Sequence, residues 1–121
     1  MLRILTDSHV PPDIALAVRK IVPLSLTPLR EWHVGNYLHA EDPQLLQLAW
    51  EERLTILIYD VNSFPLHVKD RIESGAQHAG VIYVPPSFGQ NAIGPIARAL
   101  VKVWKTKGQE DWTNRIHFLA K

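Results

Sequence analysis

The chain has 121 residues, 46% of them hydrophobic and 21% charged, a size and composition typical of one globular domain spanning residues 1–121. Its 13 basic and 12 acidic side chains nearly balance and it contains no cysteine, which excludes disulfides and thiolate chemistry and offers no overall electrostatic argument for nucleic-acid binding. Without a signal peptide or an apolar run near the ~20 residues of a membrane span, we expect a cytoplasmic protein with no membrane association.

The first predicted elements are a buried strand and a helix that follows it closely. An apolar run over residues 2–6 stops at Asp7, which is the pattern of a short buried strand. Pro11 and Pro12 suit the first turn of a helix, where backbone N–H groups have no partner, and helical spacing of apolar residues predicts a helix over residues 13–22. The later elements are predicted as a weak strand over 24–29, a loop with partly buried aromatics over 30–41, a helix over 42–52, a strand over 55–59, a helix over 63–74, a strand over 80–84, a long helix between Gly89 and Gly108, and a last strand over 116–119.

Strands that alternate with helices predict an α/β fold, a mostly parallel sheet of about five strands with helices on both faces. In such a sheet the carboxyl ends of the strands line one crevice. Asp7 and Asp60 each follow a buried strand, so we expect both at that crevice. Asp42, a candidate N-cap with Pro43 at the first helical position, joins them if its helix begins on the same side.

Three carboxylates at one crevice indicate a cation site. Clustered carboxylates repel one another unless a cation lies between them, and oxygen ligands suit Mg²⁺ or Mn²⁺. Such an ion activates water and stabilises charge on a phosphate. The alternative is structural, because helix capping alone explains Asp42, and capping or loop solvation explains Asp7 and Asp60.

Several segments together resemble a known family. DSHVPP, EDPQLLQLA, TILIYDVNSFP followed by VKDRIESG, and AGVIYVP occur in an order and spacing similar to those of PIN-like domains, small nuclease-type α/β proteins of bacterial toxin–antitoxin operons related to VapC toxins. The resemblance covers nearly the whole chain. It implies a single three-layer PIN-like domain that acts as a metal-dependent ribonuclease, with RNA and a small antitoxin as partners, Mg²⁺ or Mn²⁺ as cofactor, and catalytic, metal-binding Asp7, Asp42 and Asp60.

The chain departs from this family at two positions. Members usually carry an acidic residue where this chain has Ser8, and many carry a second aspartate where it has Asn62. These differences remove two negative charges. They favour a second hypothesis, a degenerate PIN-like module that binds a partner or RNA without cutting. A third hypothesis is a phosphoacceptor receiver domain with Asp60 after the third strand, against which stand the lack of a fifth helix and of a lysine other than Lys121 after the last strand.

Other residues are candidates for contacts with RNA or with a protein partner. His9, Asn62 and Arg71 are predicted to bind substrate phosphate. Basic residues recur along the long helix at Arg98, Lys102 and Lys105, a stripe that fits RNA phosphates or an acidic partner and equally a solvated helix face. Trp32 is a candidate for base stacking. Aromatic residues are enriched in interface cores, so we expect a homodimer or an antitoxin complex through the 30–41 loop or the long helix, with contacts from Trp32, Trp104 and Trp112.

Overall fold

A computed structural model describes residues 1–89 and 91–121. The strands are β1 (Arg3–Thr6), β2 (Ser25–Pro28), β3 (Thr55–Ile58), β4 (Val81–Tyr83) and β5 (Ile116–Phe118). The helices are α1 (Pro12–Arg19), α2 (Asp42–Glu52), α3 (Phe64–Glu73) and α4 (Ile93–Lys107), with two short 3₁₀ helices, η1 (Trp32–Gly35) and η2 (Pro86–Phe88). The five strands form one sheet in the order β2-β1-β3-β4-β5, and every neighbouring pair is parallel.

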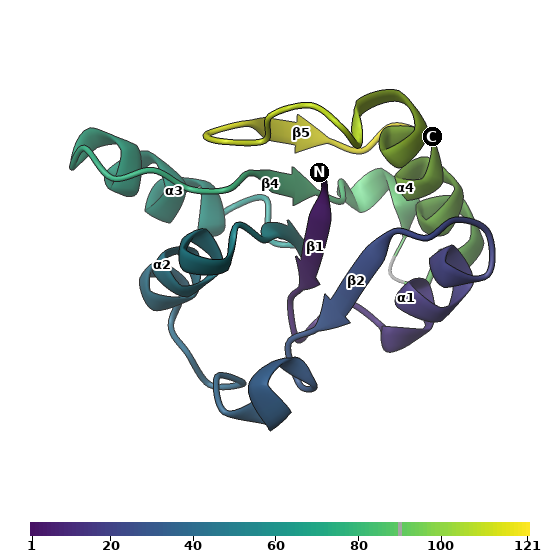
Figure 1. Ribbon diagram of the computed structural model, residues 1–121, viewed down its shortest axis with the longest axis horizontal. Coiled ribbons are helices and arrows are strands. Elements are labelled where there is room, and N and C mark those ends of the chain that lie inside the picture. The colour runs from purple at the N-terminus through teal and green to yellow at the C-terminus, as the bar shows by residue number, and fades with distance from the viewer. Residues whose placement is uncertain (90) are drawn as a thin grey trace.

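Helices cover both faces of the sheet, as Figure 1 shows, with α1 and α4 on one side and α2 and α3 on the other. The two faces carry separate apolar cores: Ile4 and Leu57 pack toward α1 and α4, while Leu5 and Ile56 pack toward α2 and α3. This alternation is what the two-residue period of a strand requires when both faces are buried. The predicted three-layer α/β fold is therefore confirmed.

Proline and glycine set several element boundaries, as the sequence predicts. Pro12 opens α1, and Pro65 lies in the first turn of α3. Gly75 follows α3 with a φ of +87°, and its N–H donates to the Ile72 carbonyl, which is the geometry that favours glycine after a helix. Pro28 lies in β2, at an edge of the sheet where the missing N–H breaks no ladder bond.

The tryptophans do not form the surface that the sequence suggests. Trp32 and Trp112 are each only 6% exposed and belong to the two cores, and Trp104 packs against the core from α4. The expectations of base stacking at Trp32 and of interface contacts from Trp32 and Trp112 are therefore wrong. Trp104 is partly buried, and the expected dimer or antitoxin complex stays a prediction. Large apolar side chains that are exposed lie elsewhere, at Met1, Leu16, Ile21, Val34, Leu66, Ile72, Ile116 and Phe118.

Candidate functional site

The strand order reverses between β1 and β3, and this is where ligands bind in open α/β sheets. From β1 the chain moves to β2 on one side, and it then crosses back to β3 on the other. Asp7 directly follows β1, and its N–H donates to the Leu57 carbonyl of β3 at 3.0 Å. Asp60 lies two residues beyond the end of β3. Asp7 and Asp60 thus lie at the crevice predicted for them.

Asp42 reaches the same region from α2. Burial raises its pKa most, nearby His67 opposes the rise, and the Asp7 and Asp60 carboxylates raise the pKa further. Because only close charges have such an effect, the three aspartates share one electrostatic environment. The capping explanation for Asp42 is wrong: Glu41 holds the N-cap position, and no side chain caps α2. Asp42 is the first helical residue, so capping does not account for it.

Asp60 has a structural role of its own. Its carboxylate accepts hydrogen bonds from the backbone N–H groups of Asn62 and Ser63, both at 2.9 Å, and from the Ser63 hydroxyl. These bonds hold the pKa of Asp60 below its ordinary value, the Ser63 hydroxyl most of all. They also supply partners to donors at the start of α3, which a helix otherwise lacks. Asp60 therefore stabilises the turn that leads from β3 into α3.

Two histidines lie beside the aspartates. The His9 ring nitrogen is 3.1 Å from an Asp7 oxygen, and the His9 side chain is 86% exposed. His67 Nε2 is 3.8 Å from an Asp42 oxygen. Sequence reasoning missed His67, although its place in the first turns of a helix that begins at the carboxyl edge would have brought it to the site.

The other predicted phosphate ligands make contacts within the protein. The Asn62 backbone donates to Asp60 as described. Arg71 donates to the Gln77 carbonyl at 2.5 Å and to Gln47 Oε1 at 2.8 Å, so it ties α3 to α2. A hollow of about 260 Å³ runs beside it and is lined by Pro43, Leu46, His67, Asp70, Arg71 and Ser74. Arg71 thus borders the region next to Asp42 and His67, and its binding of phosphate stays a prediction.

Asp7, Asp42 and Asp60 interact electrostatically, but their side chains do not converge on one point. Among residues 1–89 and 91–121, no group of three or more histidine or acidic side chains converges closely enough to hold a metal ion. The donor chemistry fits Mg²⁺ or Mn²⁺, since every candidate ligand is an oxygen. A cation would have to draw the three side chains together from their present positions.

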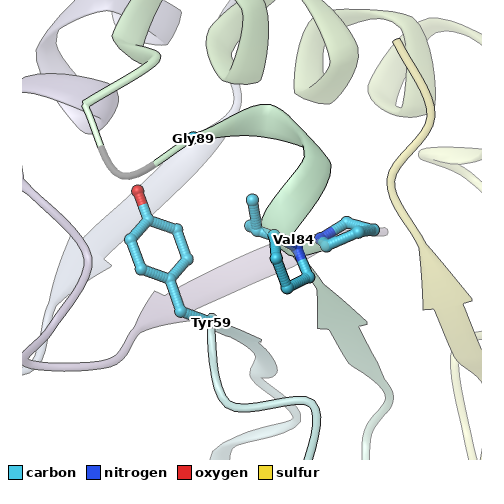
Figure 2. A pocket seen from close by; sticks show the side chains of 5 residues that line it. Tyr59, Val84 and Gly89 are labelled. Atoms are coloured by element: carbon cyan, nitrogen blue, oxygen red, sulfur yellow. The ribbon is translucent and has the colours of Figure 1, made fainter.

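An apolar cavity of about 250 Å³ lies beyond the ends of β3 and β4 (Figure 2), lined by Tyr59, Val84, Pro85, Pro86 and Gly89. Figure 2 shows the Tyr59 ring beside Val84, with its hydroxyl end directed toward Gly89. Burial raises the pKa of Tyr59, so the ring stays neutral at physiological pH. Tyr59 directly precedes Asp60 in the chain and packs against the core on the α1 and α4 side of the sheet.

A basic groove of about 400 Å³ lies next to η2, between α4 and the residues after β5. It is lined by Phe88, Pro95, Arg98, Ala99, Lys102, Ala120 and Lys121. None of these lining residues is acidic, so the groove favours anions. Two members of the predicted basic stripe, Arg98 and Lys102, are thus joined by Lys121, whose ammonium lies 5.7 Å from the centre of the Phe88 ring.

Comparison with models of known protein families found no match, and neither curated proteins nor solved structures gave one. The site is therefore interpreted from its own chemistry. In the described part of the chain, no helix is long and apolar enough to cross a membrane.

Proposed function

We propose that this protein is a metal-dependent ribonuclease of the PIN-like kind, a cytoplasmic toxin restrained by a small antitoxin. The observation that carries the proposal is the electrostatic coupling of Asp7, Asp42 and Asp60. They come from the end of β1, the start of α2 and the turn after β3, and the first and third raise the pKa of the second. Capping does not explain Asp42, and carboxylates that repel one another at a ligand-binding crevice favour a cation.

The three aspartates would hold Mg²⁺ or Mn²⁺ through their carboxylate oxygens. When bound, the ion would supply a Lewis acid for the phosphate and would lower the pKa of the water that attacks it. The chain's own contribution is orientation: the bonds from Ser63 and Asn62 fix the Asp60 carboxylate. His67 lies beside Asp42, where its ring nitrogen is placed to take up or deliver a proton.

Two further hollows support RNA as the substrate. The cavity beside Tyr59 is apolar, which suits a nucleobase stacked on an aromatic ring. The basic groove continues from η2 along α4, and lysine and arginine side chains there would neutralise backbone phosphates. An RNA strand that runs past η2 would thus meet a base site and a phosphate site in succession.

A second candidate is a module that binds RNA without cutting it. Two observations favour it. The described carboxylates do not converge closely enough to hold a metal ion, and Asp60 accepts hydrogen bonds that stabilise the turn before α3. The phosphoacceptor alternative shares its strand order with flavodoxin-like receiver folds. It is disfavoured because Ser63 and the backbone already occupy both Asp60 oxygens, and because Lys121 lies against Phe88 in the basic groove.

The deciding experiment incubates purified protein with a panel of single-stranded and structured RNAs and Mn²⁺ or Mg²⁺. Cleavage is expected in wild type and is lost in Asp7→Asn and Asp42→Asn while the melting curve stays cooperative. Asp70→Asn, an exposed aspartate on α3 that does not act on Asp42, is the matched control and should cleave normally. Binding of the same RNAs without cleavage supports the second candidate, and neither binding nor cleavage contradicts both.

A further inference from the structure

The two edges of the sheet differ in their protection against pairing with another strand. β2 and β5 are the outermost strands (Figure 1). The Leu29 N–H bonds to Thr6 of β1, so by alternation the backbone groups of Leu26 and Pro28 face away from the sheet. The Leu26 carbonyl accepts a hydrogen bond from the Arg19 guanidinium, and Pro28 has no N–H to offer. The β2 edge is therefore blocked.

β5 carries neither form of protection. It bonds to β4 through the Arg115 carbonyl and the Leu119 N–H, so the backbone groups of Ile116 and Phe118 face outward. The strand reads Ile-His-Phe and contains no proline, lysine or arginine. Such an edge offers unpaired donors and acceptors to any strand that can lie beside it.

The side chains of β5 add an apolar surface to this open edge. Ile116 is 49% exposed and Phe118 is 56% exposed, although both lie within a strand of the sheet. The Phe118 ring stacks on Tyr83 with a centroid distance of 5.0 Å, which places it on the α3 side. Ile116 lines a groove of about 470 Å³ against α3, together with Pro65, Val68, Lys69, Ile72, Glu73, His78 and Asn114. Two large apolar side chains thus stand uncovered beside unpaired backbone groups.

We propose that β5 pairs antiparallel with β5 of a second copy of this chain, so that one sheet runs through both molecules. A two-fold axis at His117 places Ile116 opposite Phe118 of the second copy, and the reverse. Because both of these residues point their backbone groups outward, each such pair exchanges two hydrogen bonds. The backbone N–H and C=O groups of His117 point toward β4. The two copies of His117 therefore form a directly opposed pair without hydrogen bonds between them, with Cα atoms about 4.5 Å apart.

The strand's own sequence selects a second copy as the occupant. The centre of the strand is flanked by one aliphatic and one aromatic residue, and antiparallel pairing of identical strands sets them against each other, a favourable cross-strand combination. The same two-fold axis puts both α3 helices on one face, so the exposed Ile72 of α3, which lines the groove beside Ile116, flanks the four apolar side chains. The interface is therefore self-complementary, as a two-fold dimer requires. This inference is independent of the proposed ribonuclease activity.

A symmetric cross-link tests the pairing directly, since the chain has no cysteine of its own. His117→Cys should form a disulfide-linked dimer under mild oxidation, because a Cα separation of about 4.5 Å in such a pair falls within the disulfide range. Ser25→Cys on the blocked β2 edge is the matched control and should not form a disulfide-linked dimer. Rapid cross-linking at 117 but not at 25 is the expected result, and equal or absent cross-linking at both sites overturns the proposal.

A second measurement does not depend on cysteine. Wild type is expected to sediment as a dimer at submillimolar concentration, and Ile116→Pro as a monomer, because proline removes an outward donor and leaves the Arg115 and Leu119 bonds to β4 intact. Ile116→Thr keeps that donor and should retain more dimer than Ile116→Pro. Circular dichroism and a melting curve for each variant show that it is folded. A monomeric wild type, or a folded Ile116→Pro that dimerises as wild type does, contradicts the pairing.

Discussion

Removal of the Asp42 charge should stabilise the metal-free protein. Burial and the Asp7 and Asp60 carboxylates raise the pKa of Asp42, and this outweighs the opposing effect of His67. A carboxyl group whose pKa is higher in the folded than in the unfolded state contributes stability below its unfolded pKa, and that contribution is lost as pH rises through the folded pKa. At neutral pH the ionised Asp42 therefore destabilises the fold, and Asp42→Asn relieves this effect.

The size of the effect is limited by solvent. The Asp42 side chain is 34% exposed, so water screens its interactions, and about 0.2–1 kcal/mol is the scale for such charges. For a domain of this length, that corresponds to a rise of about 1–5 °C in melting temperature. Loss of the His67 contact is included in this range, because the net shift of the Asp42 pKa is upward.

Unfolding of wild type and Asp42→Asn in urea and by heat, with a chelator present, measures the difference. The variant should be more stable at pH 7, and the two proteins should converge below the ordinary carboxyl value of 3.8. When Asp7→Asn is already present, Asp42→Asn should add less stability than it adds to wild type, because one of the charges that repel Asp42 has been removed. Asp70→Asn should change little at either pH. A variant less stable than wild type at pH 7 would refute the argument that Asp42 lies among repelling carboxylates.

Three further substitutions test separate parts of the structure. Asp60→Ala should lower the free energy of unfolding by about 1–2 kcal/mol and Asp60→Asn by only a few tenths, because an amide oxygen can still accept the hydrogen bonds from the Asn62 and Ser63 N–H groups. Since the pKa of Asp60 is lowered, the stability difference between the alanine variant and wild type should narrow as pH falls below 3.8. Tyr83→Phe should raise stability by about 1 kcal/mol in urea unfolding, because the buried Tyr83 hydroxyl has no hydrogen-bond partner in the described structure; a loss of stability would reveal a missing partner. Val34→Asn should raise the melting temperature by about 3–6 °C. Val34 is 90% exposed and has a φ of +52°, a conformation that strains a β-branched residue by ~1 kcal/mol relative to asparagine. An unchanged melting temperature would contradict that strain.

The elements that the sequence predicts well are those with an unambiguous local signal. The buried run that forms β3 and the proline and glycine boundaries of α3 are local properties, so the alternation of strands and helices, and with it the crevice, follows from sequence. Asp7 and Asp60 were placed correctly at the carboxyl edge of the sheet, because Asp7 directly follows β1 and Asp60 lies two residues beyond β3. Asp42 lies near the other two aspartates as expected, but Glu41, one residue earlier, holds the N-cap position that was predicted for Asp42.

What the sequence could not predict depends on how distant segments pack. Because aromatic residues are enriched in interfaces, the sequence suggests interface roles for Trp32 and Trp112, but the fold buries both side chains. The partnership of His67 with Asp42 joins α3 to α2 and has no signature in either helix alone. The open edge of β5 is invisible without the strand order, because Ile-His-Phe reads as a strand in any position. These features come from topology, which a single sequence leaves open.

Titration of metal-free protein with Mn²⁺, followed by calorimetry or by the electron paramagnetic resonance signal of the free ion, tests the central claim most directly. The claim is that Asp7, Asp42 and Asp60 form one cation site at the carboxyl edge of the sheet. Wild type and Asp70→Asn should each bind one ion per chain, and binding should weaken by an order of magnitude or more in both Asp7→Asn and Asp42→Asn. Absence of saturable Mn²⁺ binding in wild type, or equal binding in all four proteins, would contradict the account.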